Sequence, residues 1–145
     1  MRKIITFLGT YPKDTAYLYG GRTYRGRVFA EAMRQFLSFD EMLVFATRAA
    51  EETTWPILRA LDDPRLCLVS IPTGRDEDEL WAIFMNLTEE VTQGDVVVFD
   101  ITHGLRSIPF LVFLAAAYLK EARDVRIEGI IYGAYELGQP APVID

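Results

Sequence analysis

The chain has 145 residues, one cysteine and a formal net charge of −6 at neutral pH, and half of its residues are hydrophobic. This length and composition predict one domain over residues 1–145, and the lone Cys67 excludes a disulfide within the chain. The acidic balance argues against a broad surface for double-stranded DNA, and the longest apolar stretch, Ile108 to Leu119, is too short to span a bilayer. We therefore expect a cytoplasmic protein that binds neither double-stranded DNA nor a membrane.

The charge is distributed unevenly along the chain. Residues 1–48 contain eight Lys or Arg against four Asp or Glu, whereas residues 49–95 contain three against eleven. A polyanion would therefore have to bind in a pocket built from a few local cations, because the field of the whole molecule does not attract it.

Strand-like and helix-like segments alternate along the chain. A strand over Lys3–Leu8 is followed by two short strand-like runs on either side of Gly20-Gly21, with the spacing of a tight β-hairpin. Further strands are predicted over Glu41–Ala46, Leu66–Ile71, Val96–Phe99 and Val125–Tyr132. Helices are predicted over Val28–Leu37, roughly Thr54–Leu61, from Asp76 to about Gly94, and from Ser107 onward. Residues 136–145, with two prolines and a glycine, are predicted to form a linker or a frayed end.

This alternation predicts a Rossmann-like α/β fold, a mostly parallel sheet with helices on both faces and a β-hairpin inserted after the first strand. With the usual strand order 3-2-1-4-5, the first and fourth strands are neighbours and the connections reverse direction between them. Ligands of such sheets bind outside the carboxyl ends of the strands at that reversal. The loops expected there are Gly9–Lys13 and Thr102–Ser107.

The stretch Asp100–Ser107 is the most informative part of the sequence, because it joins a buried strand to an apolar helix through residues suited to phosphate. Arg106 can hold two phosphate oxygens at once, and Gly104 allows the main chain to approach them closely. The hydroxyls of Thr102 and Ser107 can donate hydrogen bonds to a ligand. Ser107 is also of a residue type that commonly caps the start of a helix. A helix that begins here directs its free amides toward an anion.

The other two polar residues of this stretch allow two interpretations each. His103, the one histidine of the chain, either has a structural role or contacts a ribose and assists proton transfer. Asp100 fits the role of orienting the loop better than that of a metal ligand, because no second carboxylate or histidine cluster accompanies it. We therefore expect no metal site and no resident cofactor.

The helix after Ser107 is apolar nearly all round, since residues 110–117 leave no solvated face for two turns. One face can rest on the sheet, and a second copy of the chain is the simplest cover for another. We therefore expect a homodimer, with two copies of the Thr102–Ser107 loop close together.

Several segments in order along the chain resemble the CRISPR-associated Rossmann fold (CARF) sensor domain of type III CRISPR ancillary proteins. The similar segments are Phe7–Thr10, Thr23–Phe29, Gly74-Arg75 with Glu79–Trp81, Phe99–Ser107 and Ile131–Glu136. The resemblance implies that a dimer binds a cyclic oligoadenylate, most often the four-adenylate ring, across its two-fold axis and switches on a fused or separate effector. Many relatives continue into a ribonuclease domain marked by an arginine and a histidine four to six residues apart. No arginine lies at that distance before the one histidine of this chain.

The resemblance and the predicted loops together give a set of expected ligand-binding residues. These residues are Gly9, Thr10, Tyr11, Thr47, Arg48, Thr102, His103, Gly104, Arg106 and Ser107. Four tyrosines near the first loop, Tyr11, Tyr17, Tyr19 and Tyr24, either stack on bases or pack against one another across strands. Trp55 and Trp81 lie in helical patterns and are predicted to be core residues.

Two functions of different class remain open from the sequence. The favoured one is a binding module that senses the ring. The alternative is a ring nuclease in which a ribose 2′-OH attacks its own phosphate without metal, with Thr10 and His103 as candidate catalytic residues. An unrelated nucleotide-binding or flavodoxin-like domain is disfavoured, because no full dinucleotide fingerprint and no lysine-containing phosphate loop follows the first strand.

Overall fold

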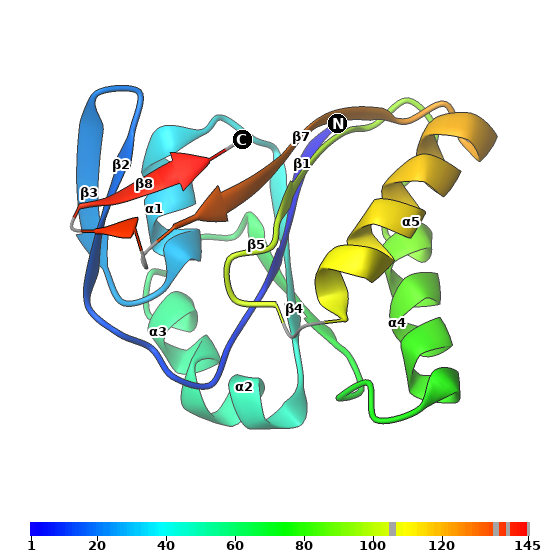
Figure 1. The fold of residues 1–145 in the computed structure, drawn as a ribbon, viewed down its shortest axis with the longest axis horizontal. Coiled ribbons are helices and arrows are strands. Elements are labelled where there is room, and N and C mark those ends of the chain that lie inside the picture. The colour runs from blue at the N-terminus through cyan, green and yellow to red at the C-terminus, as the bar shows by residue number, and fades with distance from the viewer. Residues whose placement is uncertain (105–106, 135–136, 139, 145) are drawn as a thin grey trace.

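A computed structural model describes residues 1–104, 107–134, 137–138 and 140–144 of the protein. Within these ranges, eight strands form one sheet in the order β3-β2-β8-β7-β6-β1-β4-β5 (Figure 1). The parallel part contains β5 (Leu66–Ser70), β4 (Glu41–Ala46), β1 (Arg2–Phe7), β6 (Val96–Asp100) and β7 (Arg126–Gly133). These are the five strands expected from the alternation, and their predicted order 3-2-1-4-5 is confirmed.

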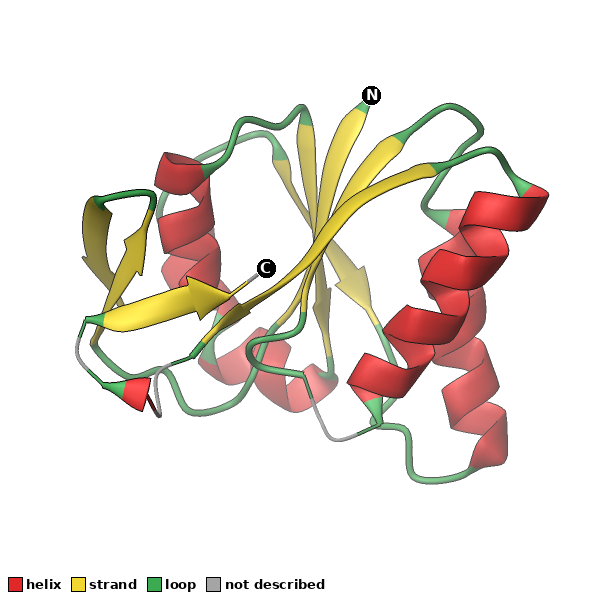
Figure 2. Ribbon diagram, turned by 45° about the horizontal axis from the view of Figure 1, so that its top comes forward, coloured by secondary structure: helices red, strands yellow, loops and turns green. Residues whose placement is uncertain are grey.

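Helices cover both faces of this sheet, as Figure 2 shows. They are α1 (Phe29–Phe36), α2 (Arg48–Thr53), α3 (Trp55–Arg59), α4 (Glu77–Glu89) and α5 (Ile108–Ala122). The first three lie on one face and the last two on the other (Figure 1). Neighbouring residues of β1 enter different cores: Ile4 packs with the α1 side, Ile5 packs with the α5 side, and both are fully buried. A strand buried on both faces explains the continuous apolar runs in the sequence.

The predicted hairpin forms between β2 (Thr15–Tyr19) and β3 (Arg22–Gly26), which pair antiparallel. Its two turn residues, Gly20 and Gly21, both have positive φ, which only glycine adopts without strain. Arg22 then donates to two carbonyls at the end of α1, so the hairpin is attached to that helix.

The end of the chain differs from the prediction. Residues Ala141–Ile144, expected to be a linker or frayed end, form strand β8, which pairs antiparallel with β7 and parallel with β2. The N–H of Ala134 donates to the Pro142 carbonyl at 2.8 Å. The prolines and the glycine suggested a linker, but the unpaired edges of β7 and β2 accept this segment as a strand.

Two features of the helices also differ from the prediction. A short helix, α2, precedes the predicted α3, and it was missed because its sequence has no apolar periodicity. Trp81 is 58% exposed, whereas a core position was expected. The apolar stripe of α4 exists, but only part of it faces the sheet. Among the described residues, no helix is long and apolar enough to cross a membrane.

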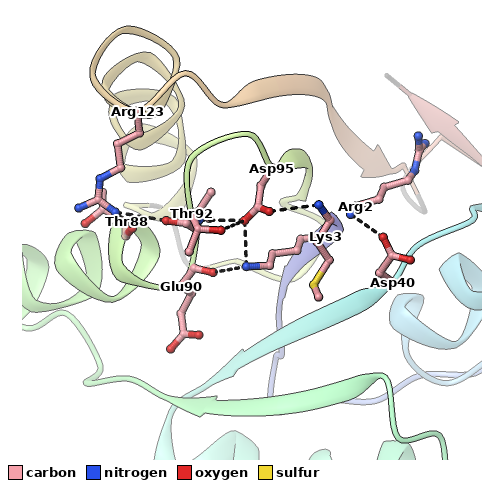
Figure 3. A network of polar contacts seen from close by, with 10 residues as sticks. Arg2, Lys3, Asp40, Thr88, Glu90, Thr92, Asp95 and Arg123 are labelled. Atoms are coloured by element: carbon pink, nitrogen blue, oxygen red, sulfur yellow. Dashed lines mark hydrogen bonds and ion pairs between the residues drawn. The ribbon is translucent and has the colours of Figure 1, made fainter.

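A buried polar cluster ties the amino ends of β1 and β6 together (Figure 3). The Nζ of Lys3 lies 2.9 Å from Asp95 Oδ2 and donates to the Glu90 carbonyl at 2.8 Å. Burial alone would raise the pKa of Asp95, but hydrogen bonds from Thr92 and Lys3 outweigh it and lower that pKa. The cluster lies at the end of the sheet opposite to the predicted ligand loops, and its groups satisfy one another.

Candidate functional site

A pocket of about 340 Å³ opens at the carboxyl ends of β1 and β6, where the sequence predicted a ligand. It lies between the loop after β1 and the loop after β6, with a third wall from the segment that leads into β2. Its lining residues are Gly9, Thr10, Tyr11, Lys13, Thr15, Tyr17, Thr102, His103 and Gly104. Six of the ten predicted binding residues are therefore brought together here.

The loop after β6 is held by a buried hydrogen-bond network centred on Asp100. One carboxylate oxygen, Oδ2, accepts from the Thr6 hydroxyl at 2.6 Å, and Oδ1 accepts from the N–H and the hydroxyl of Thr102 at 2.9 and 2.6 Å. Burial raises the pKa of Asp100, although the hydrogen bonds from Thr102 and Thr6 act against the shift. Asp100 thus orients the loop, which is the role that its sequence context favoured.

The hydroxyl of Thr102 extends this network to a third strand. Its oxygen accepts the N–H of Gly133, at the end of β7, at 2.8 Å while its hydrogen is donated to Asp100. Three adjacent strands, β1, β6 and β7, are therefore locked together directly beneath the pocket. Thr102 is nearly fully buried, so its observed contacts position the loop, and its contact with a ligand stays a prediction.

His103 joins the pocket loop to the start of α1. Its Nε2 accepts the N–H of Phe29, the first residue of α1, at 3.4 Å. Burial lowers the pKa of His103, and the charge of Asp100 opposes this shift. A neutral ring that accepts at Nε2 carries its proton on Nδ1, so His103 can donate to an acceptor but has little capacity as a base.

Gly104 is required by the packing of the loop. A Cβ at this position would lie 2.8 Å from Cγ2 of Ile108 and 2.9 Å from its Cβ, closer than side chains approach. A residue with a side chain would therefore push the loop away from the start of α5. On the facing loop, Gly9 lies against His103, and its carbonyl accepts the Thr54 hydroxyl at 2.7 Å.

The loop after β1 presents its polar groups to the pocket with little side-chain cover. Thr10 is partly buried, and Tyr11 is 91% exposed, so its ring is free to stack on a ligand. Tyr17 and Tyr19 contact the rings of Phe29 and Phe36, which lie on α1 and not on a neighbouring strand as the packing alternative expected. Tyr17 also lines the pocket, and its contact with a ligand stays a prediction.

The remaining predicted site residues lie elsewhere. Thr47 accepts the N–H of Ala50 at 3.3 Å as the N-cap of α2, and Arg48 begins that helix and pairs with Glu52. Thr47 borders a cavity of about 20 Å³ that also touches His103, but neither Thr47 nor Arg48 lines the main pocket. Both residues directly follow the end of β4, as expected, and their contact with a ligand stays a prediction.

Ser107 and Arg106 follow the described part of the pocket loop. Ser107 occupies the N-cap position of α5, with Pro109 in the first turn, but its side chain makes no capping hydrogen bond. Its φ of −75° and ψ of −23° are already helical, which turns the hydroxyl away from the first free amides. Arg106 lies outside the described residues.

The third wall of the pocket is formed by Lys13, Thr15 and Tyr17. The sequence placed Lys13 in the predicted loop and offered Tyr17 as a stacking residue, but it singled out neither Lys13 nor Thr15 for binding. Among the described lining residues, Lys13 is the only one with a permanent charge, and none is a carboxylate. The excess of basic residues in the first third of the chain was the available signal. Within the described ranges, no three His, Cys, Asp or Glu side chains gather as metal ligands would.

A second surface feature lies on the opposite side of α5. Phe110 and Phe113 are 76% and 69% exposed, and an apolar groove of about 330 Å³ runs between α4 and α5. Its lining residues are Glu77, Leu80, Trp81, Phe84, Leu111 and Leu114. The predicted uncovered face of this helix is confirmed, since the described part of one chain leaves it open to solvent.

The fold and the pocket define a Rossmann-like α/β protein with a polar pocket at the carboxyl edge of its parallel strands. No family model matches the chain. Over 82 residues it is 40% identical to the CRISPR-associated protein MJ1674 of Methanocaldococcus jannaschii, in a match covering 52% of this chain and 13% of that protein. The chain thus corresponds to a small part of the length of this curated relative.

A similar solved structure is the phosphofructokinase-2 from Escherichia coli in complex with fructose-6-phosphate. It has a TM-score of 0.44 and 13% sequence identity, over 91% of this chain and 55% of that chain. A likeness of this size supports no inference about function.

Proposed function

We propose that this chain is a sensor module of type III CRISPR signalling that binds a cyclic oligoadenylate, with cyclic tetra-adenylate as the first candidate, across a homodimer. The observation that carries the proposal is the pocket between the loops after β1 and β6. Its described wall offers main-chain groups, hydroxyls, a neutral imidazole and a lysine, and no carboxylate. The identity to a CRISPR-associated protein supports a role in CRISPR systems.

The chemistry of this wall matches a ribose–phosphate backbone better than an uncharged metabolite. The exposed ring of Tyr11 suits stacking on a base, and the Nδ1–H of His103 suits a ribose or phosphate oxygen. A cation on a wall whose described lining residues include no carboxylate favours an anion. A nucleotide with a bridging phosphate satisfies all three groups.

The size of the pocket favours a shared ligand. At about 340 Å³ it is at the small end of sites for drug-sized molecules, which span roughly 300–1,000 Å³. One subunit would therefore hold only part of an oligoadenylate ring. A closed ring has its own rotational symmetry, so two copies of the pocket facing a two-fold axis would enclose it.

The exposed face of α5 supplies a surface for such a dimer. Phe110 lies in the first turn of α5, directly after the loop that lines the pocket, and Phe113 follows one turn later. Burial of these rings against a second copy would stabilise association by about 25 cal/mol for each Å² of apolar surface removed from water. The same contact would bring the two pocket loops near each other.

A binding module is favoured over a ring nuclease because the described pocket lacks a free base. The lone pair of His103 Nε2 accepts the Phe29 N–H, and burial keeps its pKa low. The hydroxyl of Thr10 has no described base beside it in the pocket lining. Activation of a 2′-OH would thus depend on positioning alone, which gives slow turnover.

The test is incubation of the purified protein with cyclic tetra-adenylate in EDTA, followed by titration calorimetry and chromatography of the nucleotide. Retention of the intact ring with one ring for each two chains supports the sensor. Linear products support the ring nuclease. Absence of binding to the four- and six-adenylate rings at micromolar protein rejects both.

A matched pair of variants on α5 tests the shared site. Phe113→Glu places a charge on the exposed apolar face, and Lys120→Glu changes the charge at an exposed position of the same helix. We expect Phe113→Glu to give a monomer by analytical ultracentrifugation, to melt like the wild type and to lose the ring, whereas Lys120→Glu stays dimeric and binds. If the Phe113→Glu variant stays dimeric or binds as a monomer, the shared site through α5 is wrong.

A further inference from the structure

We propose that Lys13 is the cation that contacts the phosphates of the bound ring and that Thr15 positions it. This inference rests on the proposed function, because it assigns a role within the same pocket. Neither residue is among the ligand-binding residues expected from the sequence. Lys13 ends the predicted loop after the first strand, and Thr15 lies beyond that loop.

The main chain of Lys13 is fixed on both sides. Its N–H donates to the Arg27 carbonyl at 3.2 Å, and its own carbonyl accepts the Thr15 hydroxyl at 2.9 Å. Thr15 is 4% exposed and begins β2, so this hydroxyl is itself held in place. Little main-chain entropy would be lost when Lys13 binds a ligand, because its backbone is already ordered.

The side chain of Lys13, by contrast, is uncommitted. It is exposed at the pocket wall, and its Nζ makes no hydrogen bond or ion pair with the described residues. The neighbouring carboxylate of Asp14 is paired with Arg25 at 2.7 Å, on the facing strand of the hairpin. Lys3 shows the opposite case, since its ammonium is buried against Asp95.

An ammonium in this position has a specific chemical consequence. It is a point charge on a flexible stem, so it can reach any phosphate of a ring and does not read the base. When the ammonium neutralises a phosphate, it releases the counterion that was bound there. Added salt opposes this release, so the contribution of Lys13 to affinity should fall as the salt concentration rises. Recognition of adenine must come from other groups.

The test compares three variants at Lys13 and Thr15 with one neighbouring cation. Lys13→Met removes the charge and keeps most of the stem, Lys13→Arg keeps the charge, and Thr15→Val removes the positioning hydroxyl. Arg27→Ala is the matched control, because Arg27 is exposed and hydrogen-bonded to Lys13 through the main chain but does not line the pocket. Binding of cyclic tetra-adenylate is measured at several salt concentrations.

We expect Lys13→Met to weaken binding by about tenfold or more at low salt. The slope of log affinity against log salt should fall by about 0.7 for each lysine, or roughly 1.4 if two subunits share one ring. Arg27→Ala should change affinity less than about threefold, and Lys13→Arg should retain the salt slope. Thr15→Val should lower affinity without changing the slope, which marks a positioning residue.

The outcomes separate this inference from the function on which it rests. If the wild type binds no ring, the proposed function fails first. If the wild type binds but Lys13→Met matches it in affinity and salt slope, the assignment of Lys13 is overturned and the sensor proposal stands. Lys13 is likewise rejected as the specific phosphate contact if Arg27→Ala has an equal effect on affinity and slope.

Discussion

Replacement of Thr102 by valine tests whether the network beneath the pocket holds the sheet together. The substitution keeps the branched shape but deletes a hydroxyl that bonds to Asp100 at 2.6 Å and accepts the Gly133 N–H at 2.8 Å. Each buried group left without its partner costs about 1–3 kcal/mol. The Gly133 N–H loses its acceptor, whereas Asp100 keeps the bonds from the Thr102 N–H and the Thr6 hydroxyl. We therefore expect the free energy of unfolding to fall by about 2–4 kcal/mol.

Urea unfolding followed by circular dichroism measures this change, and thermal unfolding should show a melting temperature about 5–15 °C lower. Thr102→Ser restores the hydroxyl and should recover most of the loss. Thr53→Val is a second control, because its hydroxyl bonds to the Ala49 carbonyl on an exposed helix. A Thr102→Val protein within about 0.5 kcal/mol of the wild type would refute the reasoning, as would equal losses in the serine and valine variants.

Two other predictions concern ionisable groups. Burial disfavours the charged ring of His103 and lowers its pKa below the usual 6.5, despite the opposing charge of Asp100. The unfolded chain therefore binds a proton more readily, so the neutral buried ring contributes fully to the free energy of unfolding above pH 6.5, and this contribution is lost as the pH falls below 6.5. As the one histidine of the chain, it gives a single imidazole signal by NMR, and a midpoint at or above 6.5 would contradict this. Lys3→Met should cost about 1–3 kcal/mol in urea unfolding, because it removes the buried ammonium from Asp95 and leaves the N-terminal ammonium of Met1, 3.4 Å away, as the remaining cation. Arg48→Ala removes an exposed pair and should cost less than about 1 kcal/mol. Equal effects of the two substitutions would show that burial does not decide the strength of these pairs.

Most of the sheet could be predicted because its determinants are local. Apolar runs between helical patterns define the parallel strands, and Gly20-Gly21 defines the hairpin through a turn that needs positive φ at both positions. The order of the strands follows from right-handed connections and gives the position of the pocket. The glycines and threonines of the two loops, Gly9, Thr10, Thr102 and Gly104, were placed in the pocket for the same reason.

The parts that failed depend on distant partners. Strand β8 forms because β7 and β2 offer unpaired edges, which no pattern within residues 141–144 reveals. The apolar pattern of α4 in the sequence shows that Trp81 lies on an apolar face of the helix. It does not show that this face borders an open groove beside α5. Lys13 was expected in the loop after the first strand, but nothing in its sequence context selects it as a binding residue, whereas its hydrogen bond to the Arg27 carbonyl and its place in the pocket wall do.

The pairing of β2 with β8 joins two segments that lie far apart in the sequence, with Tyr17 opposite Ala141. Contacts of such wide sequence separation carry a large loop-closure entropy and form slowly. The hairpin and α1 can assemble early from neighbouring residues, but the edge of β2 finds its partner only after residues 141–144 have been synthesised. The wall of the pocket that β2 provides is therefore fixed at a late step of folding.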